Sequence, residues 1–150
     1  MKRLLLAFTL LAMAGLANAR PQTSVPAVTL HGHRFTTEFA TDDASREHGL
    51  MMRTELAADH SMLFVFPDLQ PRWFWMKNTL IPLDILYFGA DRKLVSMQLD
   101  VPPCKADPCP SYPSDAPARY VLELPAGTAR RIGVQAGDEL TVEGDIGAVR

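Results

Sequence analysis

Three polar side chains interrupt the most apolar part of the sequence. Lys77 and Asn78 follow the run Phe74-Trp75-Met76, and Asp84 comes shortly afterwards. A buried ammonium or carboxylate is very costly without a partner, so each must be paired or must lie at a cleft. One interpretation is a pocket in which Lys77 and Asn78 bind an anionic or hydroxylated ligand against Trp75. The other is a structural Lys77–Asp84 ion pair, which would give the same sequence pattern.

An extended backbone would divide this polar insert between two faces, because side chains alternate along a strand. The two sets are Phe74, Met76 and Asn78 on one face and Trp75, Lys77 and Thr79 on the other. We therefore expect Lys77 and Asn78 to point in opposite directions.

Two further charged residues are candidates for the same site. Arg46 could offer a guanidinium fork to a carboxylate or phosphate, or could be an ordinary solvated helix residue. Glu123 lies between Leu122 and Leu124 and faces opposite to both, which predicts a strand with one solvent-exposed face. Glu123 would join the site only as a partner of Lys77 or Arg46.

The sequence favours a binding site over a catalytic one. It has no G-x-S-x-G, no H-E-x-x-H and no phosphate-binding loop. We expect no metal ion and no cofactor. The leading interpretation is a non-catalytic module that binds a small ligand, an envelope component or another protein around Phe74–Thr79 and Asp84. The alternative is a periplasmic enzyme, such as a hydrolase of envelope material, that uses Lys77 and Asp84 with Glu123 or Arg46.

The elements that must position these residues are short strands and two small helices. The continuous apolar runs Met62–Phe66 and Leu83–Phe88 indicate strands buried on both faces. The turn signal His31-Gly32 predicts a hairpin. Helical turns are expected over residues 44–52 and 126–132, and Pro-rich residues 102–117 form a long ordered loop. We expect one compact, mainly β (α+β) domain over residues 27–146, a partly closed β-barrel with two short helices.

The N-terminus is typical of a cleavable signal peptide. Lys2 and Arg3 precede a short apolar run, and Ala17-Asn18-Ala19 provides the small residues of a cleavage site. Residues 1–19 are therefore the predicted signal peptide, residues 20–26 a flexible leader, and the mature protein periplasmic. No later stretch could span a membrane.

The charge of the mature chain argues against nucleic acid as a partner. Removing Lys2 and Arg3 from the 15 basic residues leaves 13 against 17 acidic residues, a net charge of −4. Binding to phosphates requires a cluster of Lys and Arg, and the sequence has none.

The two cysteines are expected to form a disulfide. Cys104 and Cys109 are an even pair in an exported chain, which favours oxidation. A structural zinc site would need four ligands, and the spacing does not fit a C-x-x-C redox motif. The bond would restrain the Pro-rich loop.

Several motifs occur in an order that resembles the domain of unknown function 192 family, a set of small and often exported bacterial and archaeal proteins. The resemblance covers residues 28–144 and implies a compact β-rich fold with no assigned activity. Arg46 lies within the first motif, whereas Ser61 stands where the family often has Gly. The motifs are Arg46-x-x-Gly49-Leu50-Met51, Met62-Leu63-Phe64-Val65-Phe66, Phe74-Trp75-Met76-Lys77-Asn78-Thr79, Ile81-Pro82-Leu83-Asp84, Tyr120-Val121-Leu122-Glu123 and Gly133-x-x-x-Gly137-Asp138.

Overall fold

The computed structural model describes residues 25–150. The predicted signal peptide over residues 1–19 and residues 20–24 of the predicted leader lie outside this range. Within it, no helix is both long and apolar enough to cross a membrane. The elements are β1 (Ala27–Leu30), β2 (His33–Ala40), α1 (Asp43–His48), β3 (His60–Gln70), β4 (Trp73–Trp75), β5 (Leu83–Phe88), β6 (Leu94–Val101), β7 (Ser111–Pro113), β8 (Ala118–Pro125), α2 (Thr128–Ile132) and β9 (Thr141–Glu143).

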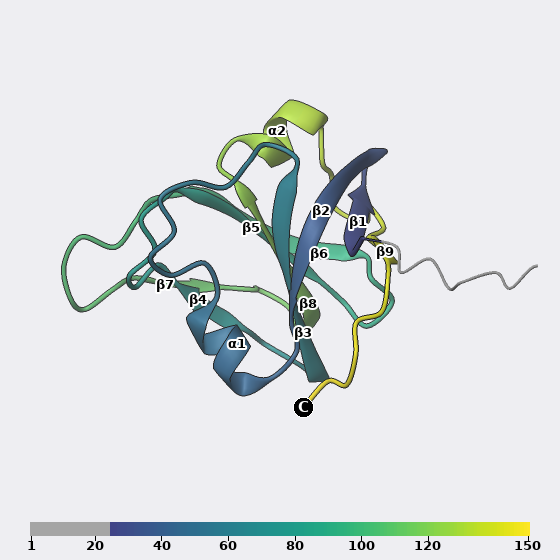
Figure 1. Ribbon diagram of the computed structural model, residues 1–150, viewed down its shortest axis with the longest axis horizontal. Coiled ribbons are helices and arrows are strands. Elements are labelled where there is room, and N and C mark those ends of the chain that lie inside the picture. The colour runs from purple at the N-terminus through teal and green to yellow at the C-terminus, as the bar shows by residue number, and fades with distance from the viewer. Residues whose placement is uncertain (1–24) are drawn as a thin grey trace, which may run out of the picture.

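The fold is mainly β with two short helices, as predicted (Figure 1). Seven strands form one sheet in the order β6-β5-β8-β3-β2-β1-β9, and β4 pairs with β7 in a separate two-stranded sheet. Neighbouring strands are antiparallel except for β2 and β3, which run parallel. The parallel pair requires a crossover, and α1 lies in that connection.

The prediction of a barrel is only partly correct, because the large sheet is not closed. Its edges are β6 and β9, and these strands are not paired with each other. The residues preceding them form one isolated bridge, between Lys93 and Glu139. A nearby backbone bond from Leu94 N–H to the carbonyl of Asp138 measures 2.9 Å. The sheet therefore curls until its two edges meet at one end only.

The sheet is buried on both faces, which explains its continuous apolar runs. Along β3, Met62 and Phe64 join one core cluster, while Leu63 and Val65 join the other. The apolar runs over residues 62–66 and 83–88 lie in β3 and β5. Buried residues of both strands belong to both core clusters, which confirms the prediction of strands buried on both faces.

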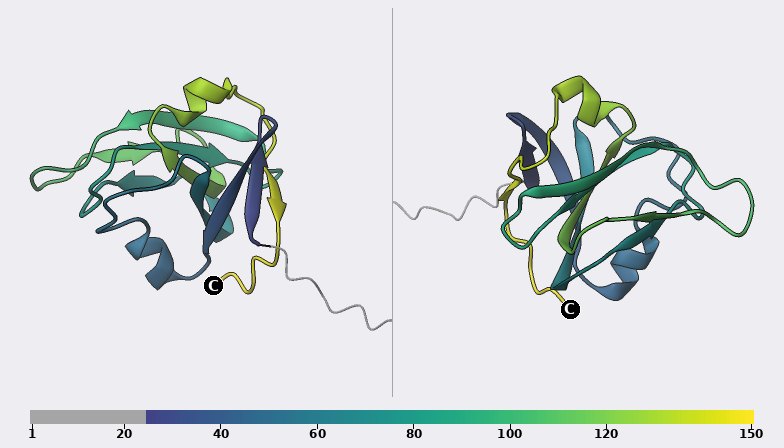
Figure 2. Two further views of the ribbon diagram at one scale, coloured as in Figure 1. Left: turned by 45° about the horizontal axis from the view of Figure 1, so that its top comes forward. Right: turned by 180° about the vertical axis from the view of Figure 1, so that it is seen from behind.

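Each face has its own cover, and the two helices lie at opposite ends of the sheet (Figures 1 and 2). Ala129 and Ile132 of α2 pack into the first cluster. The second cluster is covered by Leu50 after α1, by Phe74 of β4 and by Met76. The candidate site lies on this second face.

Local sequence signals explain where the chain turns. His31 and Gly32 both have positive φ, 47° and 76°, as a tight hairpin turn between β1 and β2 requires. Helix α2 ends at Ile132 and is followed by Gly133, whose φ of 79° is left-handed as expected. Helix α1 ends at His48, earlier than the predicted residue 52, because Gly49 follows with a φ of 47°.

The Pro-rich segment is a long loop, as predicted, but it also contains strand β7. Between β6 and β7 the chain extends away from the sheet (Figure 2). The structure pairs Cys104 with Cys109 there, with their Cα atoms 5.6 Å apart.

Candidate functional site

One wall of the site is helix α1 with the loop that follows it. Asp42 caps the helix, because its carboxylate accepts a hydrogen bond from the Ser45 backbone N–H at 2.9 Å. The Ser45 hydroxyl in turn accepts one from the Asp42 backbone N–H at 3.2 Å. After Gly49 the chain passes close to the sheet, and a Cβ atom on Gly49 would lie 3.1 Å from the Phe64 ring. The cap and the glycine fix which residues of α1 face the neighbouring turn.

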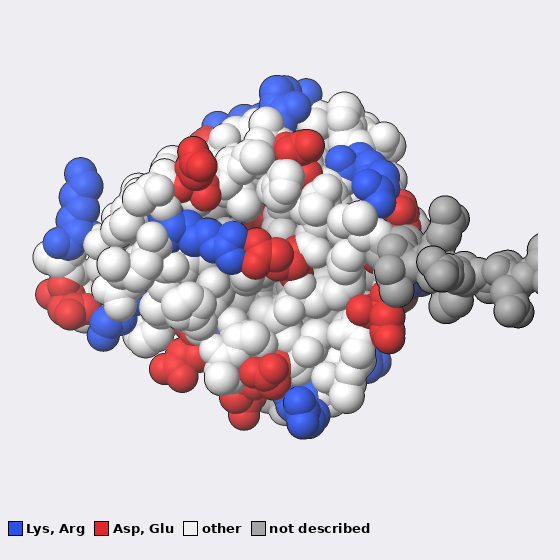
Figure 3. Space-filling view, in the orientation of Figure 1, with Lys and Arg blue, Asp and Glu red and all other residues white. Residues whose placement is uncertain are grey.

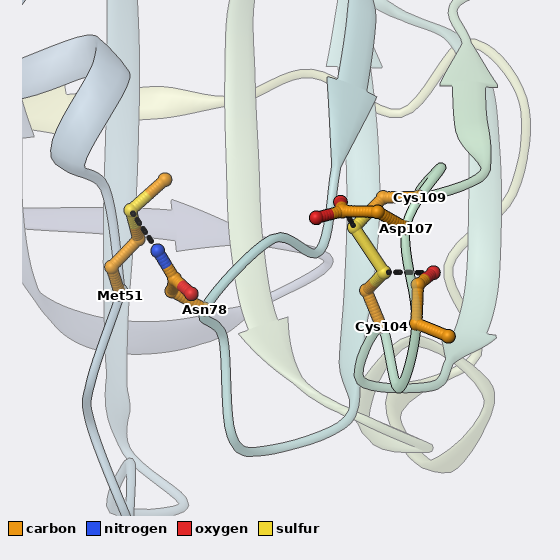
Figure 4. Close-up of a disulfide and its surroundings, with 6 residues drawn as sticks. Met51, Asn78, Cys104, Asp107 and Cys109 are labelled. Carbon is orange, nitrogen blue, oxygen red and sulfur yellow. Dashed lines mark hydrogen bonds between the residues drawn. A yellow bond between two sulfur atoms is a disulfide. The ribbon is translucent and has the colours of Figure 1, made fainter.

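The opposite wall is a tight turn over residues 76–79. Thr79 N–H donates to the Met76 carbonyl at 3.2 Å, and Asn78 has a left-handed φ of 56°, which Asn tolerates well. The Asn78 carbonyl accepts a hydrogen bond of 2.8 Å from Met52 N–H. The Asn78 amide nitrogen points to the Met51 sulfur at 4.0 Å (Figure 4). The turn is thus fastened to the loop that follows α1.

This turn also corrects the predicted alternation of side chains. Met76 is buried and Trp75 exposed, as on a strand, but β4 ends at Trp75. Lys77 and Asn78 then occupy the turn, and both line the same cleft. The expected division of these two residues between opposite faces does not apply, because a turn replaces the extended backbone on which that expectation rested.

Between the two walls lies a cleft of about 390 Å³, here called the main cleft. Trp75 forms part of it with 45 % of its surface exposed, and the Lys77 ammonium lies 5.4 Å from the centre of the Trp75 ring. The cleft therefore combines an aromatic wall with groups of both charges. Its principal lining residues are Glu47, His48, Met51, Trp75, Lys77 and Asn78.

A second, much smaller space of about 30 Å³, here called the inner hollow, shares several residues with the main cleft. It reaches Glu123 on β8, whose side chain is on the same face of the sheet as the second core cluster. Glu123 is only 4 % exposed. Within residues 25–150 no side chain or backbone group forms a hydrogen bond or ion pair with its carboxylate. Burial raises the pKa of Glu123 to about 8.

The prediction that Glu123 faces solvent is therefore wrong. Strand β8 is an interior strand of the sheet, with Glu123 opposite Met62 on β3 and Ile85 on β5. The face of β8 that carries Glu123 is covered by β4 and by the loop after α1, which contribute Phe74 and Leu50 to the second core cluster. Period-two alternation cannot distinguish a solvent-exposed face from a second core that contains one polar group.

Asp84 belongs to the fold and not to the cleft. Its carboxylate accepts backbone hydrogen bonds from Asp100 at 2.9 Å, Gly127 at 3.1 Å and Ala129 at 2.9 Å. These bonds connect β5 to the end of β6 and to the start of α2. Lys77 and Asp84 form no ion pair in the described part of the chain, so the structural pair considered from the sequence is also not observed.

Arg46 is close to the site, but its guanidinium group already forms hydrogen bonds and an ion pair within the protein. The guanidinium donates to the Val65 carbonyl at 2.8 Å and to the Asp43 carboxylate at 2.7 Å. It also bonds to the carbonyl of Arg150 and lies 5.2 Å from the centre of the Phe66 ring. Arg46 lines the inner hollow and a groove beside Trp73, yet it is mainly a connector between α1, β3 and the C-terminal residues.

The Cys104–Cys109 pair lies next to the turn, from which it is separated by another hollow of about 200 Å³ (Figure 4). Lys77 and Asn78 line that hollow together with the two cysteines. Cys104 N–H also donates to the Met76 carbonyl at 3.3 Å. The cysteine loop therefore braces the turn from the side opposite to α1.

Five of the six residues predicted for the site line one of these connected spaces: Arg46, Trp75, Lys77, Asn78 and Glu123. Sequence reasoning missed Glu47 and Phe64 as lining residues. Glu47 lies inside the Arg46-to-Met51 motif, so its position in that motif was the available signal. Phe64 had no such signal, because an aromatic residue in an apolar strand indicates only a core.

The family comparison now has a structural context. The DUF192 family model, described as an uncharacterized ACR, matches residues 26–142. The chain belongs to the DUF192 family. The match confirms the resemblance noted in the sequence, and it includes every residue of the main cleft and the inner hollow. No curated protein matches the chain.

Two solved structures are similar to this DUF192 chain. One, from Sinorhizobium meliloti 1021, is described as a candidate transcription regulator; it is 41 % identical, with 78 % of this chain and 92 % of that chain covered and a TM-score of 0.71. The other, from Novosphingobium aromaticivorans DSM 12444, is a protein of unknown function; it is 31 % identical, with 87 % and 99 % covered and a TM-score of 0.71.

Proposed function

We propose that this DUF192 protein is an exported, non-catalytic binding module whose ligand occupies the main cleft. One observation carries the proposal: the inner hollow, which adjoins the cleft, ends at Glu123, a buried carboxylate without a partner among the described residues. Among the described residues, Arg119 Nε is the one fully enclosed side-chain polar atom without a hydrogen bond, so the Glu123 oxygens keep some accessible surface. The inner hollow thus leaves the Glu123 carboxyl group accessible to a water molecule or to a polar group of a ligand. The cleft beside it has the size and mixed lining of a small-molecule site.

Binding is favoured over catalysis because Asp84 is committed elsewhere. The enzyme alternative relied on Lys77 and Asp84 acting together. Every carboxylate oxygen of Asp84 accepts from backbone N–H groups, on the far side of the sheet from the cleft. What the main cleft offers instead is an aromatic wall with polar groups around it, which suits recognition of a small ligand.

The regulator description of the Sinorhizobium meliloti structure suggests DNA as an alternative ligand. The charge of this chain argues against it. On the face shown in Figure 3, basic and acidic groups are interspersed and form no continuous basic area. A surface that binds the phosphate backbone needs clustered Lys and Arg. The proposed ligand is therefore a small molecule or an envelope component, met in the periplasm after export.

The chain offers a direct optical test, because it contains only two tryptophans, Trp73 and Trp75. In a Trp73→Phe variant, all indole fluorescence comes from Trp75 in the main cleft. This variant should be titrated with defined sets of amino acids, sugars, organic acids and amines. We expect one class to change the emission and to shift the backbone amide NMR signals of residues 47–51 and 75–79.

A matched pair of variants gives the control. Trp75→Ala should weaken binding at least tenfold, whereas Trp73→Ala removes an indole from the same strand but outside the main cleft and should leave binding unchanged. If no compound class shifts the cleft signals, or if Trp75→Ala binds as tightly as the unaltered protein, the proposed function is wrong.

A further inference from the structure

The residues that line the inner hollow include three aromatic residues and two acids, together with Arg46 and His48. Phe64 and Phe74 meet edge to face with ring centres 4.9 Å apart, and Trp75 completes the aromatic wall. The carboxyl groups of Glu47 and Glu123 belong to the same lining. Ring faces carry negative charge density, so rings together with carboxylates attract a cation. The aromatic and acidic part of the lining therefore favours a positively charged guest, provided that the Arg46 guanidinium is engaged elsewhere.

No cation of the described chain fills this role. The Arg46 guanidinium is held by the Val65 carbonyl and the Asp43 carboxylate. Lys77 lines the main cleft and the hollow beside the cysteines but does not line the inner hollow. Tyr87 packs in the same core cluster, yet its hydroxyl donates to the Tyr112 carbonyl at 2.7 Å. The Glu123 carboxyl is left for a group from outside the chain.

The size of the inner hollow limits what that group can be. About 30 Å³ accommodates something the size of a water molecule. A primary ammonium head is of that size and has three N–H donors, whereas a guanidinium or a quaternary ammonium is larger. The main cleft, at about 390 Å³, has room for the rest of such a molecule along Trp75.

We propose that the ligand of this module is a primary amine, whose ammonium head enters the inner hollow and pairs with Glu123 while its carbon chain lies against Trp75 in the main cleft. The proposal rests on the proposed function and specifies the ligand class of the same site. A free alkylamine and the side chain of a lysine residue share this chemistry, and the test below separates them.

The proposal has a consequence for pH. Since burial holds the pKa of Glu123 at about 8, its carboxyl carries a proton near neutral pH, and pairing with an ammonium must expel that proton. An alkylammonium keeps its own charge to about pH 10. Affinity should therefore rise about 50-fold between pH 6 and pH 8, with release of about one proton at the lower pH. Other ionisable groups around the site are Glu47, His48, Arg46 and Tyr87.

Isothermal titration calorimetry of the folded, oxidised protein tests this. The probes are n-butylammonium, its neutral analogue n-butanol, tetramethylammonium and an N-acetyl-lysine methylamide. We expect binding of one or both primary amines, no binding of n-butanol and tetramethylammonium, and the stated rise with pH. Repeating the titration in buffers of different ionisation enthalpy counts the protons. Binding of n-butylammonium alone identifies a free amine, and binding of the lysine derivative alone identifies a peptide side chain.

Variants connect the signal to Glu123. Glu123→Gln should lower amine affinity at least tenfold and abolish proton release, and it should fold because it removes a buried ionisable group. Glu55→Gln alters an exposed carboxylate outside the site and should change nothing. His48→Gln should keep the dependence on pH. Equal amine binding in Glu123→Gln would overturn the inference.

The failure of this inference can be separated from failure of the proposed function. If the amines do not bind but a sugar, acid or other compound shifts the signals of the main cleft, the binding module stands and its ligand is not an amine. If nothing shifts those signals, both are wrong.

Discussion

Glu123 and Asp84 are two buried carboxylates on neighbouring strands with opposite surroundings. Asp84 has 0 % exposure and accepts three backbone hydrogen bonds, which replace the water that burial removed. Glu123 is 4 % exposed and has no such replacement within residues 25–150. The Asp84 carboxylate should stabilise the fold. The Glu123 carboxyl group should destabilise it in the absence of the proposed ligand.

Glu123→Gln should therefore stabilise the unliganded protein at neutral pH. Below pH 4.5 the carboxyl is protonated in both the folded and the unfolded chain. Between pH 4.5 and 8 the unfolded chain loses the proton while the folded chain keeps it, so stability falls as pH rises. The variant lacks this loss and should gain about 3 kcal/mol in free energy of unfolding at pH 7.

Urea unfolding at pH 4, 5.5, 7 and 8 measures this difference. The gain should vanish at pH 4 and grow through the interval, while Glu55→Gln should follow the unaltered protein throughout. A constant difference at every pH would show that Glu123 does not titrate as its burial implies.

Asp84 and Lys77 should behave as independent residues. Asp84→Asn places an amide where three N–H donors converge, and we expect a loss of about 3 kcal/mol in free energy of unfolding. Lys77→Met should change it by less than about 1 kcal/mol, because Lys77 has no buried partner. The double variant should equal the sum of the two within about 0.5 kcal/mol. If thermal or chemical melts showed that one substitution rescues the other, the interpretation of Lys77 and Asp84 as a structural ion pair would be correct.

At the scale of elements, Gly49 determines how α1 meets the sheet. Its φ of 47° disfavours a side chain, and an added Cβ would press on Phe64 at 3.1 Å. Gly49→Ala should cost about 2 kcal/mol, since both backbone strain and a clash act there. Gly137 is a matched control with a φ of 88° and nothing within 4 Å of an added Cβ. Gly137→Ala should cost about 1 kcal/mol from the backbone alone. If chemical unfolding gave equal losses of free energy of unfolding for Gly49→Ala and Gly137→Ala, a clash with Phe64 would not contribute.

The cysteine loop should support the turn of the cleft. Cys104 and Cys109 close a loop so small that chain-entropy reasoning gives about 2 kcal/mol for the bond. Changing both to serine should cost about that amount. It should also weaken ligand binding, because the unrestrained loop would no longer hold the backbone N–H of residue 104 against the Met76 carbonyl in the turn. Alkylation without reduction, followed by mass spectrometry, checks the bond itself. Modification of both cysteines in the unreduced protein would contradict it.

The sequence predicted the elements well where a signal is local. The hairpin at His31-Gly32, the strands of the two apolar runs and the end of α2 at Gly133 follow from residue types within a few positions. The partners of Asp84 could not be predicted, because Gly127 and Ala129 lie more than forty residues away. The burial of Glu123 could not either, since it depends on which segments cover the second face of the sheet. The unusual polar residues were enough to predict where the site lies. The inner hollow that extends from it to Glu123 became visible only in the folded structure.

At the scale of the whole molecule, export predicts a defined mature end. If the signal peptide is cleaved after Ala19, the protein recovered from the periplasm should begin at Arg20. N-terminal sequencing checks this directly. A variant with Ala17 and Ala19 changed to large residues should accumulate uncleaved, whereas the same changes at Ala7 and Ala12 leave the cleavage site intact. Material that starts at Met1, or that is found only in membranes, would contradict the expectation.

The strand order also determines when the fold can be completed as the chain is made or translocated. The N-terminal group β1-β2-β3 and the hairpin β5-β6 join into one sheet only through β8, which lies between β3 and β5. Strand β1 pairs with β2 in the hairpin, but its other edge stays open until β9 pairs with it. A chain passing in single file through a narrow channel therefore keeps an incomplete sheet until residue 125 has emerged, and one open edge of β1 until residue 143 has emerged. Because the sheet is completed so late, the chain would stay incompletely folded while it is translocated and would reach its full stability only afterwards.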